Sequence, residues 1–240
     1  MKIKIDIVIP VLNEEALLEN NIKQIWKYIS QELNDNYNFK IIIADNGSVD
    51  KTEEIGTRLS LDYEGKILYH KVFYQGVGLA LKSAWSFSDA DIIGYMDLDL
   101  ATDLRHIPEA ISSLIADDTD IVYGSRLHKR SKVIGRSLKR ELSSRVFNFI
   151  LRAYLGVNFS DGMCGFKFMK RKYLNGILEG GANSDGWFFC TEILIIAEWQ
   201  KLKLIELPVI WTDSPNSKVS IIKLSLEYLK AMKSIKNKYQ

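Results

Sequence analysis

A regular alternation of short β-rich runs and helical segments over the first 125 residues constrains the fold more than any other feature. The β-rich runs lie at 3–9, 40–44, 66–70, 92–96 and 120–124. Between them, apolar residues recur at helical spacing, which predicts helices at about 16–31, from Thr52, at about 79–87 and at about 108–115. Strands that alternate with helices are typical of a parallel sheet covered by helices. The sequence therefore predicts an α/β fold with a central, mostly parallel sheet.

Size and composition fit one domain of this class. The chain has 240 residues, of which 47% are hydrophobic, enough for one large core. The net charge of +2 does not indicate a nucleic-acid-binding protein. Cys164 and Cys190 have no metal-binding spacing, so we expect reduced thiols in a cytoplasmic protein. No signal peptide is expected, and no apolar run reaches the roughly 18 residues of a spanning helix.

The run at 92–96 is apolar throughout and ends in two carboxylates, Asp97 and Asp99, separated by one residue. A continuous apolar run is typical of a buried parallel strand, and ligands bind where such strands leave the sheet. Hard oxygen ligands at that edge suit Mg²⁺ or Mn²⁺ shared with a diphosphate. The alternative is a polar loop that caps the next helix, with Asp103 as N-cap.

Two glycine-containing turns follow predicted strands. Residues 45–52 form a strand–turn–helix junction, half of a nucleotide-binding βαβ unit, although the glycine-rich dinucleotide fingerprint is absent. Gly76 and Gly78 open the next helix, where they would let a phosphate approach the backbone. A simple tight loop is the alternative for this pair of glycines.

The second half of the chain has a different pattern. Glycines surround an aromatic strand at about 161–168, a helix runs from about 187 to 200, and a strand follows at 204–211. Glu192 lies near the start of that helix, where the helix dipole alone would favour an acidic residue.

Two basic amphipathic helices are predicted, at 136–155 and 221–238. In the first, one side carries the apolar residues Leu138, Leu142, Val146, Phe149, Ile150 and Tyr154. Each helix has five basic residues and one acidic residue. Basic amphipathic helices are typical of proteins at an anionic membrane surface. For a single helix, a core position with a solvated basic face is the alternative; the presence of two favours the membrane surface.

Several motifs together resemble family-2 glycosyltransferases of the GT-A fold. The shared motifs are 8–15 (VIPVLNEE), 44–52 (ADNGSVDKT), Gly76-x-Gly78, 97–102 (DLDLAT), 123–126 (YGSR), 161–167 (DGMCGFK), 192–194 (EIL) and 211–218 (WTDSPNSK). Within that family the chain is most similar to dolichyl- or polyprenyl-phosphate β-glucosyltransferases, and next to dolichyl-phosphate mannose synthases. The resemblance covers about residues 3–235. It implies one domain, with a nucleotide-sugar half at 1–125, an acceptor half at 126–218 and a basic helix at 219–240.

The resemblance also implies roles for individual residues. The residues that it places around the nucleotide-sugar donor are Pro10, Val11, Asn13, Glu14, Asp45, Gly76 and Gly78. Asp97 and Asp99 would bind Mg²⁺ or Mn²⁺ at the donor diphosphate. Those that it places on the acceptor side are Arg126, Arg140, Ser144, Asp161 and Lys218. Arg140 and Ser144 are one helical turn apart, so both can contact one phosphate.

The implied reaction is an inverting, single displacement at the anomeric carbon of the sugar. A phosphomonoester acceptor needs no general base, because its second pKa is about 6. Glu192 would then orient a substrate. If the acceptor were instead a soluble sugar or glycan, a base would be needed and Glu192 would be the candidate.

Departures from the family pattern leave a third alternative open. Asn46 replaces a common aspartate and Val77 a common lysine, which would also suit a non-enzymatic binding module. Ala101 stands where mannose synthases often have glutamine, which favours UDP-glucose over GDP-mannose as donor. The expected partners are a nucleotide-sugar, a polyprenyl phosphate and the cytosolic face of a membrane. The sequence does not indicate an oligomeric state.

Overall fold

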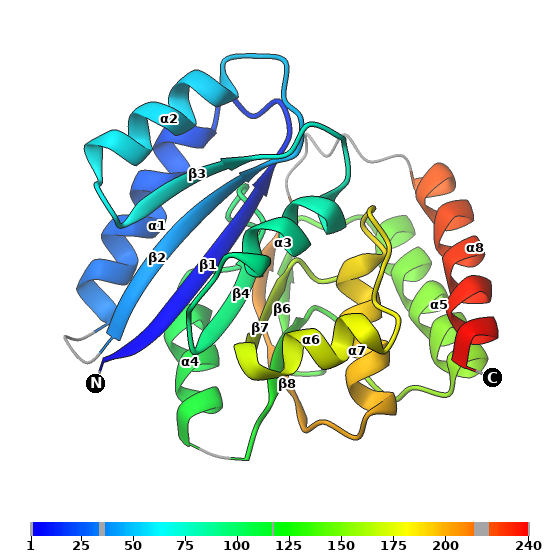
Figure 1. Ribbon diagram of the computed structural model, residues 1–240. Coiled ribbons are helices and arrows are strands. Elements are labelled where there is room, and N and C mark those ends of the chain that lie inside the picture. Colours follow the sequence, from blue (N-terminus) through cyan, green and yellow to red (C-terminus); the bar gives the residue numbers. More distant parts are fainter. Residues whose placement is uncertain (1, 34–36, 117, 214–220, 240) are drawn as a thin grey trace.

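The computed structural model describes residues 2–33, 37–116, 118–213 and 221–239, and it has helices packed around a central sheet (Figure 1). Its strands are β1 (Ile3–Val11), β2 (Tyr37–Asp45), β3 (Ile67–Lys71), β4 (Ile92–Met96), β5 (Ile121–Ser125), β6 (Lys132–Ile134), β7 (Phe166–Lys170), β8 (Leu204–Pro208) and β9 (Ile210–Thr212). Its helices are α1 (Leu18–Glu32), α2 (Thr52–Asp62), α3 (Val77–Ser86), α4 (His106–Ala116), α5 (Leu138–Leu155), α6 (Leu174–Glu179), α7 (Phe189–Trp199) and α8 (Ile221–Tyr239), with a 3₁₀ turn at Arg171–Tyr173.

The main sheet has the strand order β3-β2-β1-β4-β7-β5-β8. All its pairings are parallel except those of β7, which runs antiparallel to both β4 and β5. A second, two-stranded sheet pairs β6 with β9. The predicted mostly parallel α/β fold is therefore confirmed, and the antiparallel β7 joins the strand that carries Asp97 to the strand that ends before Arg126.

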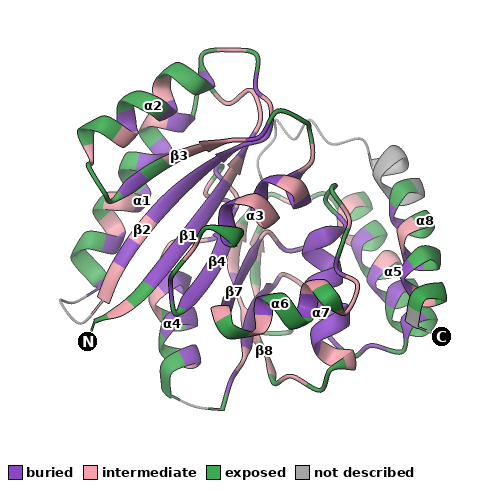
Figure 2. Cartoon of the chain, in the orientation of Figure 1, coloured by how far each residue is buried: buried purple, intermediate pink, exposed green. Residues whose placement is uncertain are grey.

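Helices cover both faces of the main sheet (Figures 1 and 2). One hydrophobic cluster joins the sheet to α1, α2 and α4, and the other joins it to α3, α5, α6, α7 and α8. Side chains of β4 enter the two clusters alternately, Ile92 and Met96 in one and Ile93 and Tyr95 in the other. This explains the unbroken apolar run, since a strand buried on both faces has no solvent-facing position.

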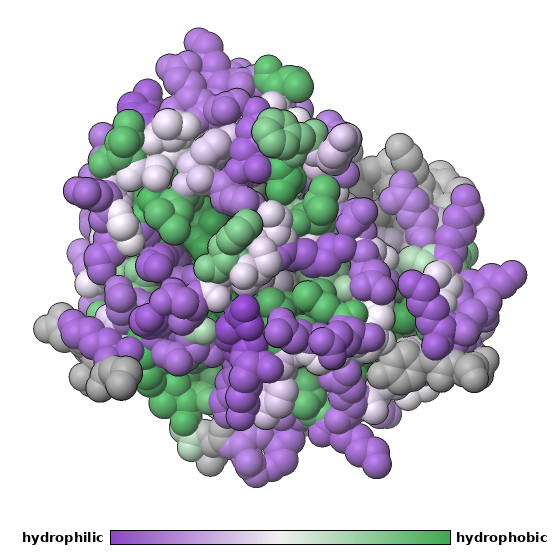
Figure 3. All heavy atoms as spheres, viewed as in Figure 1, coloured by the Kyte–Doolittle hydropathy of each residue, from purple (hydrophilic) through white to green (hydrophobic). Residues whose placement is uncertain are grey.

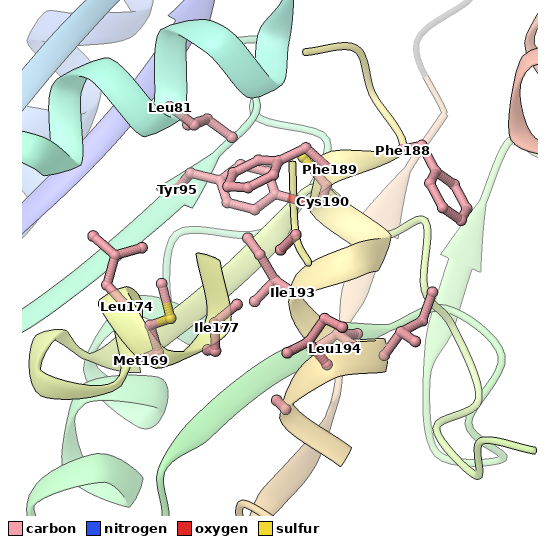
Figure 4. Packing of buried hydrophobic residues seen from close by; sticks show 14 of the residues in the cluster. Leu81, Tyr95, Met169, Leu174, Ile177, Phe188, Phe189, Cys190, Ile193 and Leu194 are labelled. Atoms are coloured by element: carbon pink, nitrogen blue, oxygen red, sulfur yellow. The ribbon is translucent and has the colours of Figure 1, made fainter. Parts of the chain in front are cut away.

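Helix α7 fills the space beside β4. Its Phe189 ring lies next to Tyr95, and Ile193 and Leu194 point toward α6 (Figure 4). The Phe189 ring centroid is 6.1 Å from that of Trp85 in α3. Full burial of each such side chain contributes on the order of 2 kcal/mol. The packing holds the start of α7, including Glu192, against the same strand that ends in Asp97.

The amphipathic helix at 136–155 is present as α5, but its apolar row lies outside the core. Six apolar side chains of this row are 40% to 87% exposed, and the buried residues are Ser144, Asn148, Leu151 and Leu155. The alternative of a core helix with a solvated basic face holds in part, because Leu151 and Leu155 belong to the core and Arg145 and Arg152 are exposed, but the predicted apolar row does not enter that core. Helix α8 packs along α5 (Figure 1), with the Phe147 and Tyr228 rings 5.3 Å apart.

Further outcomes concern the second half of the chain. The strand predicted at 204–211 is divided into β8 and β9, which belong to different sheets. Neither β6 nor α6 was predicted. Among the described residues, no helix combines the length and the apolar character needed to cross a membrane. The predicted substrate-binding residue Lys218 lies outside the described residues.

Candidate active site

The chain turns sharply after β4, at the carboxyl edge of the sheet. Leu100 has a left-handed backbone (φ 57°), and the Ala101 amide donates to Asp99 Oδ1 at 3.0 Å. Asp97 is half-buried and Asp99 exposed. Burial and the neighbouring Asp99 raise the pKa of Asp97 to about 7, although Arg126 and Lys167 oppose the shift. The turn therefore brings two repelling carboxylates to one place.

This pair fits a divalent cation. Among the described residues, no group of three or more His, Cys, Asp or Glu side chains is placed to hold a metal ion. Mg²⁺ is commonly bound by one or two carboxylates, with substrate phosphates and water completing its coordination, and Asp97 and Asp99 would suit that role. Burial and then Asp99 raise the pKa of Asp97, and a nearby cation would oppose both effects.

Gly165 makes room for the Asp97 side chain. A Cβ on Gly165 would lie 1.9 Å from Asp97 Oδ2, and the Asp97 amide donates to the Gly165 carbonyl at 3.1 Å. The loop before β7 thus passes directly against the candidate metal ligand, and only glycine fits at this contact.

Hydrogen bonds join the predicted donor residues after β1 to the loop after β2. The Asn13 amide donates to Ser48 Oγ at 2.9 Å, the Val49 amide donates to Asn13 Oδ1 at 2.9 Å, and the Glu14 amide donates to Thr52 Oγ1 at 2.9 Å. Pro10 and Val11 lie beside Ala44 and Asp45 in the parallel register. These hydrogen bonds hold together two loops that are far apart in sequence, and the loops form one rim at the carboxyl edge of the sheet.

Asp45 is fully buried within this rim. Its Oδ1 accepts from the Ser48 amide at 2.8 Å and its Oδ2 from the Tyr69 hydroxyl at 2.5 Å. Both oxygens therefore have partners in the protein, which makes Asp45 a support for the turn. Asn46 Oδ1 accepts from the Gly76 amide, a link between two loops that the sequence did not reveal.

The glycines at the start of α3 lie against the loop before α7. A Cβ on Gly76 would be 2.5 Å from the Asp185 carbonyl oxygen, and one on Gly78 would be 2.3 Å from that of Ser184. Glu192 holds this loop, because its carboxylate accepts from the Ser184 amide at 2.8 Å and from Ser184 Oγ at 2.6 Å. Burial raises the pKa of Glu192, and these bonds oppose the rise.

On the acceptor side, Arg126 is bound by Asp161. Arg126 Nε and Nη2 donate to the two Asp161 oxygens at 2.8 and 2.9 Å, and the Asp161 side chain is fully buried. Although burial alone would raise the pKa of Asp161, Arg126 lowers it to about 2. Asp97 and Arg126 also lie close enough to shift each other's pKa. The candidate metal ligands and the acceptor-side arginine therefore share one electrostatic environment.

Helix α5 contributes Arg140 and Ser144. Arg140 Nη1 contacts both oxygens of Asp213, at 2.5 and 2.7 Å. Ser144 Oγ is buried and has no hydrogen-bond partner among the described residues. Asn148 connects the helix to the site, since its Oδ1 accepts from the Gly162 amide at 2.9 Å. Asn148 therefore faces the loop that also contains Asp161.

Lys167 supports this loop from below. Its Nζ donates to the Cys164 carbonyl at 2.6 Å, to the Gly162 carbonyl at 3.2 Å and to the Tyr95 hydroxyl at 3.1 Å. Burial lowers the pKa of Lys167. The sequence included Lys167 in a motif but gave no role to it. The available signal was its position in the sequence, two residues after Gly165, the glycine that lies beside Asp97.

The sequence of this chain is similar to a known family and to individual known proteins. The model of the family described as "Glycosyl transferase family 2" matches residues 6–178. Glycosyltransferase AglD of Haloferax volcanii is 30% identical over 221 residues, which cover 92% of this chain but 35% of AglD. Dolichyl-phosphate beta-glucosyltransferase ALG5A of Trichomonas vaginalis is 28% identical over 236 residues, which cover 94% of this chain and 72% of that protein.

Solved structures show the same fold. Glucosyl-3-phosphoglycerate synthase of Mycobacterium tuberculosis, in complex with Mn²⁺, UDP and glucosyl-3-phosphoglycerate, aligns with a TM-score of 0.69 over 97% of this chain and 79% of its own, at 19% identity. Its complex with UDP alone gives 0.67 at 20% identity. At this identity the likeness is one of fold, and that fold is GT-A. On the match to 6–178, the chain belongs to glycosyltransferase family 2.

Proposed function

We propose that this protein is an inverting glycosyltransferase that moves glucose from UDP-glucose to a polyprenyl phosphate such as dolichyl phosphate. The observation that carries the proposal is the common electrostatic environment of Asp97 and Arg126, where a cation site adjoins a guanidinium. The relatives' names support the acceptor and the sugar, since ALG5A is described as a dolichyl-phosphate beta-glucosyltransferase. Ala101, at the end of the DLDLA motif, favours UDP-glucose over GDP-mannose.

In the proposed reaction the protein brings two anions together. Asp97 and Asp99 would bind Mg²⁺ or Mn²⁺, which when bound supplies Lewis-acid stabilisation of the departing diphosphate. Arg126 and Arg140 offer guanidinium groups to the acceptor phosphate, and Ser144 offers a hydroxyl donor. A phosphomonoester with a second pKa of about 6 is mostly a dianion at pH 7 and attacks without losing a proton.

The contacts of Glu192 favour a positioning role. Both its carboxylate oxygens accept hydrogen bonds from Ser184, and the loop that they hold packs against Gly76 and Gly78. A general base must be within hydrogen-bond reach of the proton that it removes. A carboxylate that already holds a loop through both oxygens suits an acceptor that needs no base, which counts against a soluble hydroxyl acceptor.

The exposed row on α5 supports a place at an anionic membrane surface. Leu138, Leu142 and Phe149 are exposed, and contiguous exposed apolar side chains on a basic helix are typical of interfacial helices. Arg145 and Arg152 lie on the same helix, and each cation near an anionic leaflet contributes about 1 kcal/mol. The buried side of α5 carries Ser144, so one helix would link a membrane on the cytosolic face to the acceptor phosphate.

Transfer from UDP-glucose to polyprenyl phosphate in anionic vesicles tests the proposal. We expect Mg²⁺- or Mn²⁺-dependent product, and a loss of at least about 100-fold in turnover in Asp99→Ala and in Arg140→Ala, the size seen when groups that stabilise transition-state charge are removed. Arg58→Ala and Asp118→Ala are the matched controls, since both residues form exposed surface ion pairs. Unchanged turnover in Asp99→Ala and Arg140→Ala would refute the site.

Two further measurements separate the alternatives. Glu192→Gln should keep a substantial part of its turnover if Glu192 only holds the loop, whereas complete loss with a soluble sugar acceptor would indicate a base. Sedimentation with anionic vesicles should fall when Leu142 and Phe149 are replaced by glutamate. Equal sedimentation of this variant and the wild type would refute the proposed membrane face.

A further inference from the structure

Arg126 and Arg140 each bind a carboxylate, and the Arg140 pair is the more accessible of the two. The Asp161 side chain on Arg126 is fully buried, and it also accepts the Arg126 and Met163 amides. The Arg140–Asp213 pair lies nearer to solvent, with side chains 30% and 10% exposed. Breaking a buried ion pair is costly because it leaves an unpaired charge inside the protein. A partly exposed pair can exchange its anion at lower cost.

A second observation indicates that Arg140 faces a place for another anion. Ser144 Oγ, one helical turn from Arg140, is buried and has no partner among the described residues. Arg136 lies 5.6 Å from the Trp211 ring, and its Nη1 is 3.3 Å from Glu141 Oε2, so this arginine already has a carboxylate partner. Buried donors normally have acceptors. A ligand with several acceptor oxygens, bound at Arg140, would also accept a hydrogen bond from the Ser144 hydroxyl, which the Asp213 carboxylate leaves without a partner.

We propose that Asp213 is an internal competitor for the acceptor phosphate: its carboxylate occupies Arg140 until a phosphomonoester displaces it. This inference rests on the proposed function and names a residue that controls access of the acceptor phosphate to Arg140. Asp213 is placed for this exchange by its backbone, because its amide donates to the Ile134 carbonyl at 2.8 Å, beside the β6–β9 pair.

The charges explain what such a competitor achieves. A phosphomonoester carries about −1.5 to −2 charges at pH 7, against −1 for Asp213. Sugar transfer forms a bond from one phosphate oxygen to the anomeric carbon and breaks the bond from that carbon to the diphosphate oxygen, so that the nucleoside diphosphate leaves and the product is a phosphodiester with a single charge. Asp213 remains attached to the protein, where a tethered group acts at millimolar effective concentration. Its competition weakens the binding of substrate and product by the same factor, and the singly charged product, which binds Arg140 less strongly, is then released more readily.

Ligand binding tests this without sugar transfer. The dissociation constants of farnesyl phosphate and of its methyl ester, a phosphodiester with the same tail, are measured by calorimetry. Wild type should prefer farnesyl phosphate. Asp213→Asn should bind both ligands about tenfold more tightly, the size of one lost charge-assisted competitor, because removal of an internal competitor raises the affinity of Arg140 for each ligand by the same factor. Asp213→Ser should behave alike, and Asp118→Asn is the control, because Asp118 pairs with Lys203 on the surface.

The outcomes separate this inference from the proposed function. Affinities of Asp213→Asn equal to those of Asp118→Asn, or a gain confined to the doubly charged farnesyl phosphate, as simple charge repulsion would give, overturn the inference, even if wild type transfers glucose to polyprenyl phosphate. An equal gain for both ligands supports the inference even if no glucose is transferred, and the proposed function then fails alone. Glycerol 3-phosphate serves as a tail-free phosphomonoester; if it binds as tightly as farnesyl phosphate, the Arg140 site recognises phosphate without its lipid.

Discussion

Asp161→Asn should destabilise the protein more than any surface substitution of the same kind. Asp161 is fully buried and accepts four hydrogen bonds, from Arg126 Nε, Arg126 Nη2 and the amides of Arg126 and Met163. The substitution removes the negative charge and replaces an acceptor oxygen with a donor that faces other donors. Arg126 is then left as a buried charge without a counter-charge, which is the unfavourable part of breaking a buried ion pair.

The magnitude follows from the pKa of Asp161. Its fall from 3.8 to about 2 corresponds to about 2 kcal/mol, because one pKa unit is about 1.4 kcal/mol. Removing one partner of a buried pair typically costs about 3–5 kcal/mol, so about 3 kcal/mol is expected at pH 7. Urea unfolding measures this difference. Asp118→Asn, which breaks an exposed pair with Lys203, should stay within about 1 kcal/mol of wild type.

The pH dependence gives a second, independent check. The folded-state pKa of Asp161 is depressed, so its contribution is fully present above the ordinary value of 3.8 and is lost as pH falls through about 2. The gap in unfolding free energy between wild type and Asp161→Asn should therefore narrow between pH 4 and pH 2. A loss below about 1 kcal/mol at pH 7, or a gap that does not narrow in acid, would refute the assigned strength of the Arg126–Asp161 pair.

Two more substitutions test the loop between Asp161 and β7. In Gly165→Ala the new Cβ would lie 1.9 Å from Asp97 Oδ2. The affinity for Mn²⁺, measured by calorimetry, should therefore fall about tenfold, the scale of a change next to a metal ligand. Gly186→Ala, whose new Cβ would have no atom near it, is the control, and equal Mn²⁺ affinities of the two variants would contradict the prediction. Lys167→Met leaves the Cys164 and Gly162 carbonyls without their donor and should lower the free energy of unfolding by about 2 kcal/mol. The control Lys172→Met, at an exposed lysine, should change the free energy of unfolding by under about 0.5 kcal/mol. An equally small effect of Lys167→Met would show that the loop does not depend on Lys167.

Local sequence patterns predicted the elements of the first half well. The strand Ile92–Met96 has the predicted bounds, because an apolar run between polar residues is decided locally. No local sequence pattern predicted where the antiparallel strand β7 lies in the sheet. Its position between β4 and β5 depends on a distant contact, in which the Phe168 ring fills the space where Gly94 has no side chain. No periodicity within either segment reports that contact.

The same limit applies to the site. The sequence named Asp97, Arg126 and Arg140 by type and motif, but not the carboxylate that each arginine holds, because Asp161 and Asp213 lie 35 and 73 residues away from their partners. Helix α5 shows the limit most clearly. Its amphipathic pattern predicted a helix, yet the side turned inward carries Ser144 and Asn148 beside Leu151 and Leu155, and the predicted apolar row is exposed.

That inversion of α5 has a physical reason in the proposed reaction. Two unit negative charges 5 Å apart repel by about 3 kcal/mol at an effective dielectric constant of 20, and a diphosphate and a phosphate present several such pairs. A site that accepts both must keep donors and cations turned inward, which leaves the apolar row of its helix without a core. An anionic bilayer offers that row an apolar environment and holds the lipid tail at the same level. The arrangement that looks unfavourable for a water-exposed helix is therefore the one expected if α5 contacts a membrane outside and a phosphate inside.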